Sequence, residues 1–97
     1  MGFLRRGSEP RTAAADLESS HVLTLIGKPG CHLCEQAREV VLRVAGELGA
    51  SVQERSILDE PELYEAYWEK IPVTLVDGVP HDYWRVDERR LRAALGG

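Results

Sequence analysis

The pair of cysteines in the segment C-H-L-C carries the residue types and spacing most suited to chemistry in this chain. Cys31 and Cys34 are its two cysteines. Thiols one helical turn apart lie on the same face of a helix, within reach of a disulfide bond. Such a pair can exchange two electrons with a disulfide substrate. The spacing therefore predicts a redox-active dithiol. We assign Cys31 as the nucleophile and Cys34 as the resolving thiol, because the first cysteine of such a pair is usually the exposed one.

The elements around the cysteines place them at the start of a helix. Residues 21–27 form a short apolar run rich in β-branched side chains, which predicts a buried strand. Lys28-Pro29-Gly30 then favours a turn. Residues 31–48 show the apolar periodicity of a helix, with Gly49 where a helix-ending glycine is common. The predicted inward face of this helix consists of Leu33, Ala37, Val40, Val41, Val44, Ala45 and Leu48.

A helix N-terminus favours the thiolate form of a cysteine, because the first N–H groups lack helical partners and the helix dipole attracts negative charge. Lys28 adds a positive charge three residues before Cys31. His32 adds a hydrogen-bond donor that becomes cationic when it is protonated. We therefore expect Lys28 and His32 to lie beside the bound substrate disulfide.

Length and charge restrict the classes of function. The chain has 97 residues and a net charge of −4, which predicts one small domain and disfavours binding to nucleic acid. We expect residues 1–20 to be a flexible extension and residues 21–97 to be the folded domain, acting as a monomer. No apolar run approaches the roughly 18 residues of a membrane span, so no membrane partner is expected.

The N-terminal segment also bears on the compartment. Arg5 and Arg6 are followed by a polar segment instead of the apolar stretch of a secretory signal. This pattern favours a cytoplasmic location. In a reducing compartment, closely spaced cysteines indicate a redox pair more readily than a structural disulfide.

The middle of the chain predicts a second strand and a second helix. Residues 51–57 form a more polar strand, as suits a sheet edge. Asp59 is the expected cap of a short helix, with Pro61 in its first turn. We expect the inward face of this helix to consist of Leu63, Ala66 and Tyr67.

The last third predicts a hairpin and a final helix. A strand over residues 71–76 ends at Asp77-Gly78, a type I′ turn signal, and a fourth strand follows over about 79–84. Pro80 cannot donate to a sheet ladder, so the fourth strand should be an edge. Asp87 is the expected cap of the last helix. The order β-α-β-α-β-β-α predicts an α/β fold, a mixed four-stranded sheet with helices on both faces.

These features together resemble a glutaredoxin of the thioredoxin-like superfamily, and most closely the small bacterial glutaredoxin-like proteins. The resemblance covers about residues 21–95. The features that carry it are K-P-G-C-H-L-C over residues 28–34, Ile71-Pro72-Val73 at a strand start, the Asp77-Gly78 hairpin, and Asp87 at the last helix.

The resemblance implies a thioredoxin-like fold and a thiol–disulfide oxidoreductase. It also implies that the Ile71–Pro72 bond is cis and faces the cysteines. Backbone groups of Ile71 would then pair with an extended substrate, and Asp87 would accept a bond from a substrate amine. The implied substrates are protein disulfides or glutathione mixed disulfides. The implied reductant is glutathione or a protein reductase, and neither a metal nor an organic cofactor is required.

The chain departs from the glutaredoxin pattern at two places. Typical glutaredoxins have Pro-Tyr or a similar pair between the cysteines, where this chain has His32-Leu33. They also carry Gly-Gly before the last helix, where glutathione docks, and this chain has Trp84-Arg85. Glycine permits a close backbone approach that these residues do not. The second departure disfavours glutathione and favours a protein disulfide as substrate.

Two other functions fit parts of the pattern. The domain could have kept the fold and lost turnover, serving as a protein-interaction module. A closed zinc site needs about four nitrogen or sulfur ligands, and one chain offers only Cys31, Cys34 and His32. A metal would therefore need a dimer or outside ligands, as in a glutathione-ligated iron–sulfur cluster between two chains.

Overall fold

The computed structural model describes residues 21–96, so the extension expected over residues 1–20 lies outside the described residues, as does Gly97. The observed order of elements is the predicted β-α-β-α-β-β-α. The elements are β1 (Val22–Gly27), α2 (His32–Leu48), β2 (Ser51–Ser56), α3 (Pro61–Tyr67), β3 (Val73–Val76), β4 (Val79–Tyr83) and α4 (Glu88–Ala94).

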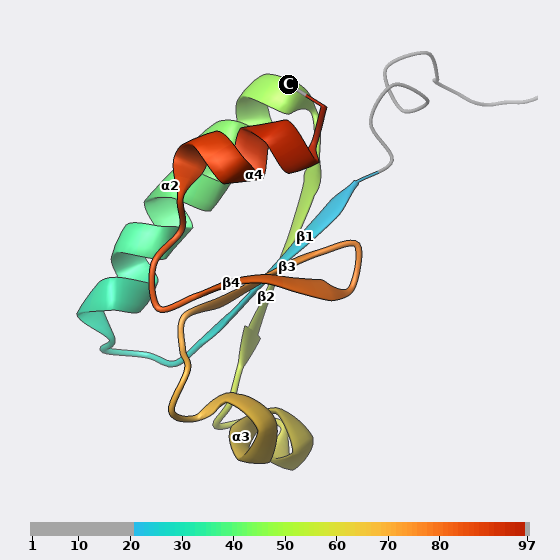
Figure 1. Ribbon diagram of the computed structural model, residues 1–97. Coiled ribbons are helices and arrows are strands. Elements are labelled where there is room, and N and C mark those ends of the chain that lie inside the picture. The colour runs from blue at the N-terminus through green and yellow to red at the C-terminus, as the bar shows by residue number, and fades with distance from the viewer. Residues whose placement is uncertain (1–20, 97) are drawn as a thin grey trace, which may run out of the picture.

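The strands form one mixed four-stranded sheet in the order β2-β1-β3-β4 (Figure 1). β1 pairs with β2 in parallel and with β3 antiparallel, and β3 and β4 form the antiparallel hairpin. The polar strand β2 and the proline-containing strand β4 are the two edges, as predicted. Because β1 and β3 are antiparallel, the end of β1 lies beside the start of β3. The connection that leads to the cysteines and the connection that contains Pro72 therefore meet at one end of the sheet.

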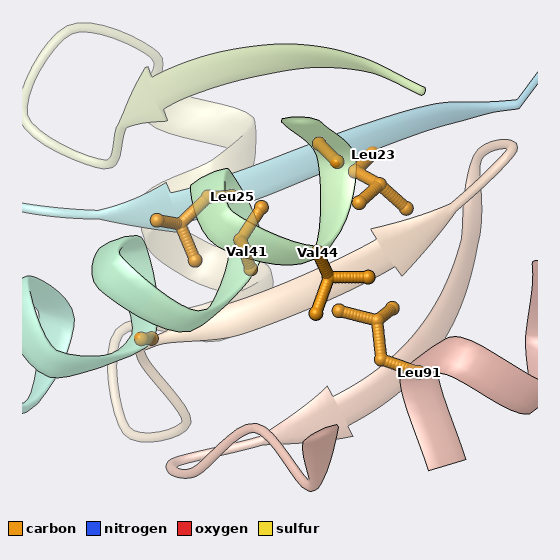
Figure 2. Close-up of a cluster of buried hydrophobic side chains, with 7 residues drawn as sticks. Leu23, Leu25, Val41, Val44 and Leu91 are labelled. Carbon is orange, nitrogen blue, oxygen red and sulfur yellow. The ribbon is translucent and has the colours of Figure 1, made fainter. Parts of the chain in front are cut away.

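Helices cover both faces of the sheet, which confirms the predicted layers (Figure 1). α2 and α4 lie on one face, where Leu23 and Leu25 of β1 meet Val41 and Val44 of α2 and Leu91 of α4 (Figure 2). Burial of each such side chain contributes about 1.5–3 kcal/mol. On the α3 side a smaller cluster consists of Ile26, Ile57 and Val73, with Leu63 and Tyr67 packed against it.

The turns have the backbone that the sequence predicted. Gly49 ends α2 with φ 80°. Asp77 and Gly78 have φ 53° and 83°, and two positive values are what a type I′ hairpin turn requires. Asp87 caps α4 by accepting a hydrogen bond from the Arg90 N–H at 3.1 Å.

Several details differ from the prediction. Two of them are element starts, because β3 begins at Val73 and not at Ile71, and α2 begins at His32 and not at Cys31. Glu60, not Asp59, precedes α3, and it makes no side-chain capping bond because its carboxylate pairs with Arg55. Ala66 is exposed, because α3 contacts the sheet through a narrow stripe around Leu63 and Tyr67. Leu33 is 39% exposed, because Cys34 takes the inward position in that turn of α2.

Within residues 21–96, none of the helices is long and apolar enough to cross a lipid bilayer.

Candidate active site

Cys31 is the N-cap residue of α2, because the helix begins at His32, one position later than predicted. Its backbone is extended (φ −97°, ψ 113°), and its carbonyl accepts the first helical hydrogen bond, from Glu35 N–H at 3.0 Å. Its Sγ accepts a hydrogen bond from Cys34 N–H at 3.2 Å. The sulfur thus occupies the place of a capping oxygen, where free amide hydrogens and the helix dipole stabilise negative charge. Cys31 is half-buried, whereas Cys34 is buried.

Cys34 points into the protein instead. Its side chain is 7% exposed and packs against Gly27 at the end of β1. A Cβ atom at Gly27 would lie 2.8 Å from Cys34 Sγ and 3.1 Å from Cys34 Cβ, closer than side chains tolerate. Gly27 was missed among the predicted site residues. A glycine inside a strand often marks a place where another part of the chain approaches the backbone closely, and Gly27 at the end of the predicted strand could have been identified in this way.

The burial of Cys34 changes the pKa of its thiol. Burial, and then the hydrogen bond with Cys31, raises the pKa of the Cys34 thiol to about 11, while the nearby Lys28 backbone opposes the increase. Cys34 therefore stays protonated near neutral pH. A half-buried sulfur at the helix terminus and a buried thiol one turn later form an asymmetric pair, as the nucleophile and resolving roles require.

The Ile71–Pro72 peptide bond is cis, as the resemblance implied. Val73, the next residue, pairs with Ile26 of β1, and one position further along β1 is Gly27, on which Cys34 packs. Pro72, the residue before β3, therefore lies at the end of the sheet that holds the cysteines. Among residues 21–96, the N–H and C=O of Ile71 have no hydrogen-bond partner. These backbone groups can therefore pair with an extended peptide.

Lys28 and His32 both lie on the loop and first turn that carry the cysteines, and both are exposed. Gly30, between Lys28 and Cys31, has φ 73°, a backbone that glycine adopts without strain. His32 Nε2 lies 3.1 Å from Gln36 Nε2, so this edge of the ring faces along the helix. Contact of Lys28 or His32 with a substrate stays a prediction.

The connection from β4 to α4 carries the other predicted residues. Asp87 acts as a cap, and its own N–H donates to Asp82 Oδ2 at 3.0 Å. Trp84 has φ 67°, a left-handed backbone that is uncommon for a residue with a side chain. Its N–H donates to the Pro72 carbonyl at 2.7 Å. Contact of Asp87 with a substrate amine stays a prediction.

Two pockets flank the first turns of α2. A pocket of about 330 Å³ lies between α2 and the ends of β1 and β2, with Cys34 and Lys28 in its wall. A smaller one, of about 150 Å³, lies between α2 and the β4–α4 connection. No group of three or more histidine, cysteine, aspartate or glutamate side chains suited to a metal ion occurs in the described part of the chain.

The order and packing of the helices and strands match those of solved structures with the thioredoxin fold. Chloroplastic thioredoxin z superposes with a TM-score of 0.65 at 13% identity, covering 84% of this chain and 80% of that one. A solution structure of a Nitrosomonas europaea protein gives a TM-score of 0.68 at 21% identity, covering 77% and 91%. The protein is therefore a thioredoxin-like α/β protein with a C-x-x-C pair at the start of its long helix.

The sequence also identifies a specific family within this class. The family described as "Glutaredoxin-like domain (DUF836)" matches residues 22–96, and the chain belongs to it. Uncharacterized proteins of Mycobacterium tuberculosis and Mycobacterium bovis are 35% identical over 76 residues, which is 73% of this chain and 78% of theirs. An X. campestris protein of known structure is 32% identical, with a TM-score of 0.63 over 76% of this chain and 95% of that one.

Proposed function

We propose that this protein is a thiol–disulfide oxidoreductase that uses Cys31 and Cys34 to reduce protein disulfides or glutathione mixed disulfides. The observation that carries the proposal is the asymmetry of the pair. Cys31 Sγ accepts an N–H at the helix terminus, while Cys34 is buried one turn away. Membership of a glutaredoxin-like family supports it.

The reaction begins when the Cys31 thiolate attacks one sulfur of the substrate disulfide. A mixed disulfide forms, and the other substrate sulfur leaves as a thiolate. Cys34 then loses its proton and attacks the Cys31 sulfur. This step forms the Cys31–Cys34 bond, and the second substrate sulfur leaves and takes up a proton. The substrate gains two electrons, and the protein loses them.

The chain's own residues would assist in distinct ways. The N–H of Cys34 and the helix dipole stabilise the Cys31 thiolate before the attack and again when Cys31 is released. The unpartnered backbone groups of Ile71 would hold the substrate chain in an extended form. Lys28 and His32 would lie beside the substrate, and Asp87 would accept a bond from a substrate amine.

Regeneration requires a second thiol system. Either two glutathione molecules or a protein reductase would supply the two electrons that restore the dithiol. We place this cycle in the cytoplasm, which keeps thiols reduced, and assign it to the monomer.

A trapping experiment tests the proposal. Cys34→Ser should accumulate mixed disulfides between Cys31 and substrate proteins in a cell extract, because the resolving step is lost. Cys31→Ser should neither trap substrates nor turn over a disulfide. A Cys31→Ser protein with undiminished reductase activity would refute the role of Cys31. Full-length protein without reductase activity toward any disulfide would favour the interaction-module alternative.

A further inference from the structure

Trp84 is held rigidly next to the cis proline although its side chain is 54% exposed. Its backbone N–H donates to the carbonyls of Pro72 at 2.7 Å and Lys70 at 3.2 Å. Its indole Nε1 donates to the Glu69 carbonyl at 2.9 Å. The left-handed backbone of Trp84 is thus fixed from two sides. A fixed aromatic side chain on a protein surface loses little conformational entropy when it binds a partner.

A small recess lies between Trp84 and the first turns of α2, the helix that carries the dithiol. Trp84 and Arg85 form one wall, and Leu33 and Gln36 in the first turns of α2 form the other, around a volume of about 150 Å³. Leu33 lies between the two cysteines in the sequence and is 39% exposed. The recess is about the size of one apolar side chain, and Leu33 in its wall connects it in sequence to both cysteines.

One basic residue without an ion-pair partner among residues 21–96 borders this recess. The chain has a net charge of −4. Among residues 21–96, the arginines in ion pairs with carboxylates are Arg38, Arg43, Arg55, Arg90 and Arg92. The basic residues without such a pair there are Lys28, Lys70, Arg85 and Arg89. Lys28 precedes the dithiol, Lys70 lies 5.3 Å from the Tyr83 ring centre, and Arg85 borders the recess.

We propose that this recess and Arg85 at its border are the docking surface for protein disulfides, with Trp84 and Arg85 as specificity-determining residues. The fitting partner is an extended loop that carries an apolar side chain and a carboxylate next to its disulfide. The apolar side chain enters the recess between Leu33 and Trp84, and the carboxylate meets Arg85. The inference rests on the proposed function and names its substrate class.

The chemistry of the loop follows from the two properties of the surface. An aromatic wall facing an exposed leucine favours an apolar side chain by removing both from water. The guanidinium of Arg85, which has no ion-pair partner among residues 21–96, favours a carboxylate on the partner and so contributes to specificity. A small disulfide has no flanking residue to place in the recess and gains neither contribution.

Three disulfide substrates test the surface. Two are peptide mixed disulfides with the same cysteine, one flanked by leucine and glutamate and the other by glycine and lysine. The third is bis(2-hydroxyethyl) disulfide, which reports reactivity without docking. The wild-type protein should prefer the leucine–glutamate peptide by roughly tenfold in kcat/KM, the discrimination typical of one apolar side chain in a pocket.

Substitutions then separate the contribution of the apolar recess from that of the positive charge. Trp84→Asn keeps a residue that tolerates a left-handed backbone but removes the indole, so the peptide preference should fall by several-fold relative to the small disulfide. Trp84→Gly serves the same purpose if the asparagine variant is unstable. Arg85→Glu should reverse the charge preference. Arg89→Glu, the matched control on α4, should leave all three kcat/KM values within about twofold.

The outcomes distinguish this inference from the proposed function. Equal kcat/KM for the two peptides, with normal turnover of the small disulfide, would overturn the docking surface and leave the oxidoreductase intact. An unchanged peptide preference in both Trp84 variants would overturn the role of Trp84. Loss of the charge preference as salt is raised would support the role of Arg85. Failure of the wild-type protein to reduce even the small disulfide would overturn both.

Discussion

Gly27 and Cys34 are packed so closely that a Cβ on the glycine would lie 2.8 Å from the cysteine sulfur. The contact joins the end of β1 to the first turn of α2. It buries Cys34 while Cys31, one turn away at the N-cap, stays half-buried. The difference in burial between the two thiols therefore depends on the absence of a side chain at Gly27.

Gly27→Ala should displace the Cys34 sulfur and destabilise the fold by about 1–3 kcal/mol, as overpacking does. The Cys34 sulfur should also become accessible, and a thiol reagent should label it faster in the native protein. Chemical denaturation measures the first effect, and alkylation followed by mass spectrometry measures the second.

Gly46→Ala is the matched control, because a Cβ there meets nothing within 4 Å and α2 continues through this position. It should stabilise the protein by about 0.5–1 kcal/mol, since alanine favours a helix over glycine. If Gly27→Ala behaved like this control, the packing of Cys34 against Gly27 would not explain its burial.

The second reaction step should accelerate as pH rises. The pKa of Cys34 is raised to about 11, by burial and then by its hydrogen bond with Cys31. The attacking thiolate is therefore a small fraction near neutral pH and grows with pH until the pKa is reached. Release of a fluorescent thiol from a preformed Cys31 mixed disulfide should quicken about tenfold per pH unit below the inflection. The inflection should fall below 11, because Cys31 in a disulfide no longer carries charge. A rate that does not change with pH would contradict the protonated state of Cys34.

Asp87→Ala should cost about 0.5–2 kcal/mol of stability, because the Arg90 N–H loses its capping acceptor. Asp87→Asn should restore most of it, since asparagine caps equally well. Asp59→Ala, at the position wrongly expected to cap α3, should change the free energy of unfolding by less than about 0.5 kcal/mol. Urea denaturation compares the three. An equal loss from Asp59→Ala would show that Asp59 has a structural role this fold does not explain.

The hairpin should weaken in acid. A hydrogen bond from Val22 N–H, and then one from His21, lowers the pKa of Asp77 below its ordinary value. A group with a lowered pKa in the folded state stabilises the protein above its unfolded pKa, and this is lost as pH falls through the folded pKa. The stability of the wild type should therefore drop more between about pH 6 and pH 3 than that of Asp77→Asn, which also tolerates the left-handed turn. Parallel pH profiles for the two proteins would contradict this role.

The sequence predicted those parts of the fold that depend on local chemistry. The Asp77-Gly78 turn, the proline in edge strand β4 and the cap at Asp87 each follow from what one or two residues can do with their own backbone. The resemblance to glutaredoxins added the cis bond before Pro72, which neighbouring residues alone do not determine.

The sequence did not predict the features that depend on contacts between distant parts of the chain. Leu33 and Cys34 are apolar neighbours on α2, and the one that packs against Gly27 of β1 is Cys34, a tertiary contact that the helix pattern does not predict. Asp59 and Glu60 are both plausible caps, and the position of Arg55 on β2 draws the glutamate away. The left-handed backbone of Trp84 is held by carbonyls from the α3–β3 connection, so no local sequence pattern predicts it.

The most direct test of the central claim is to oxidise the reduced protein with a small disulfide and map the product. Peptide mass mapping under non-reducing conditions identifies which sulfurs are linked. The proposal predicts a monomer in which Cys31 is joined to Cys34, with the mixed disulfide on Cys31 as the sole intermediate. Oxidised protein that contains only mixed disulfides or linked dimers, with Cys34 still a free thiol, would contradict it.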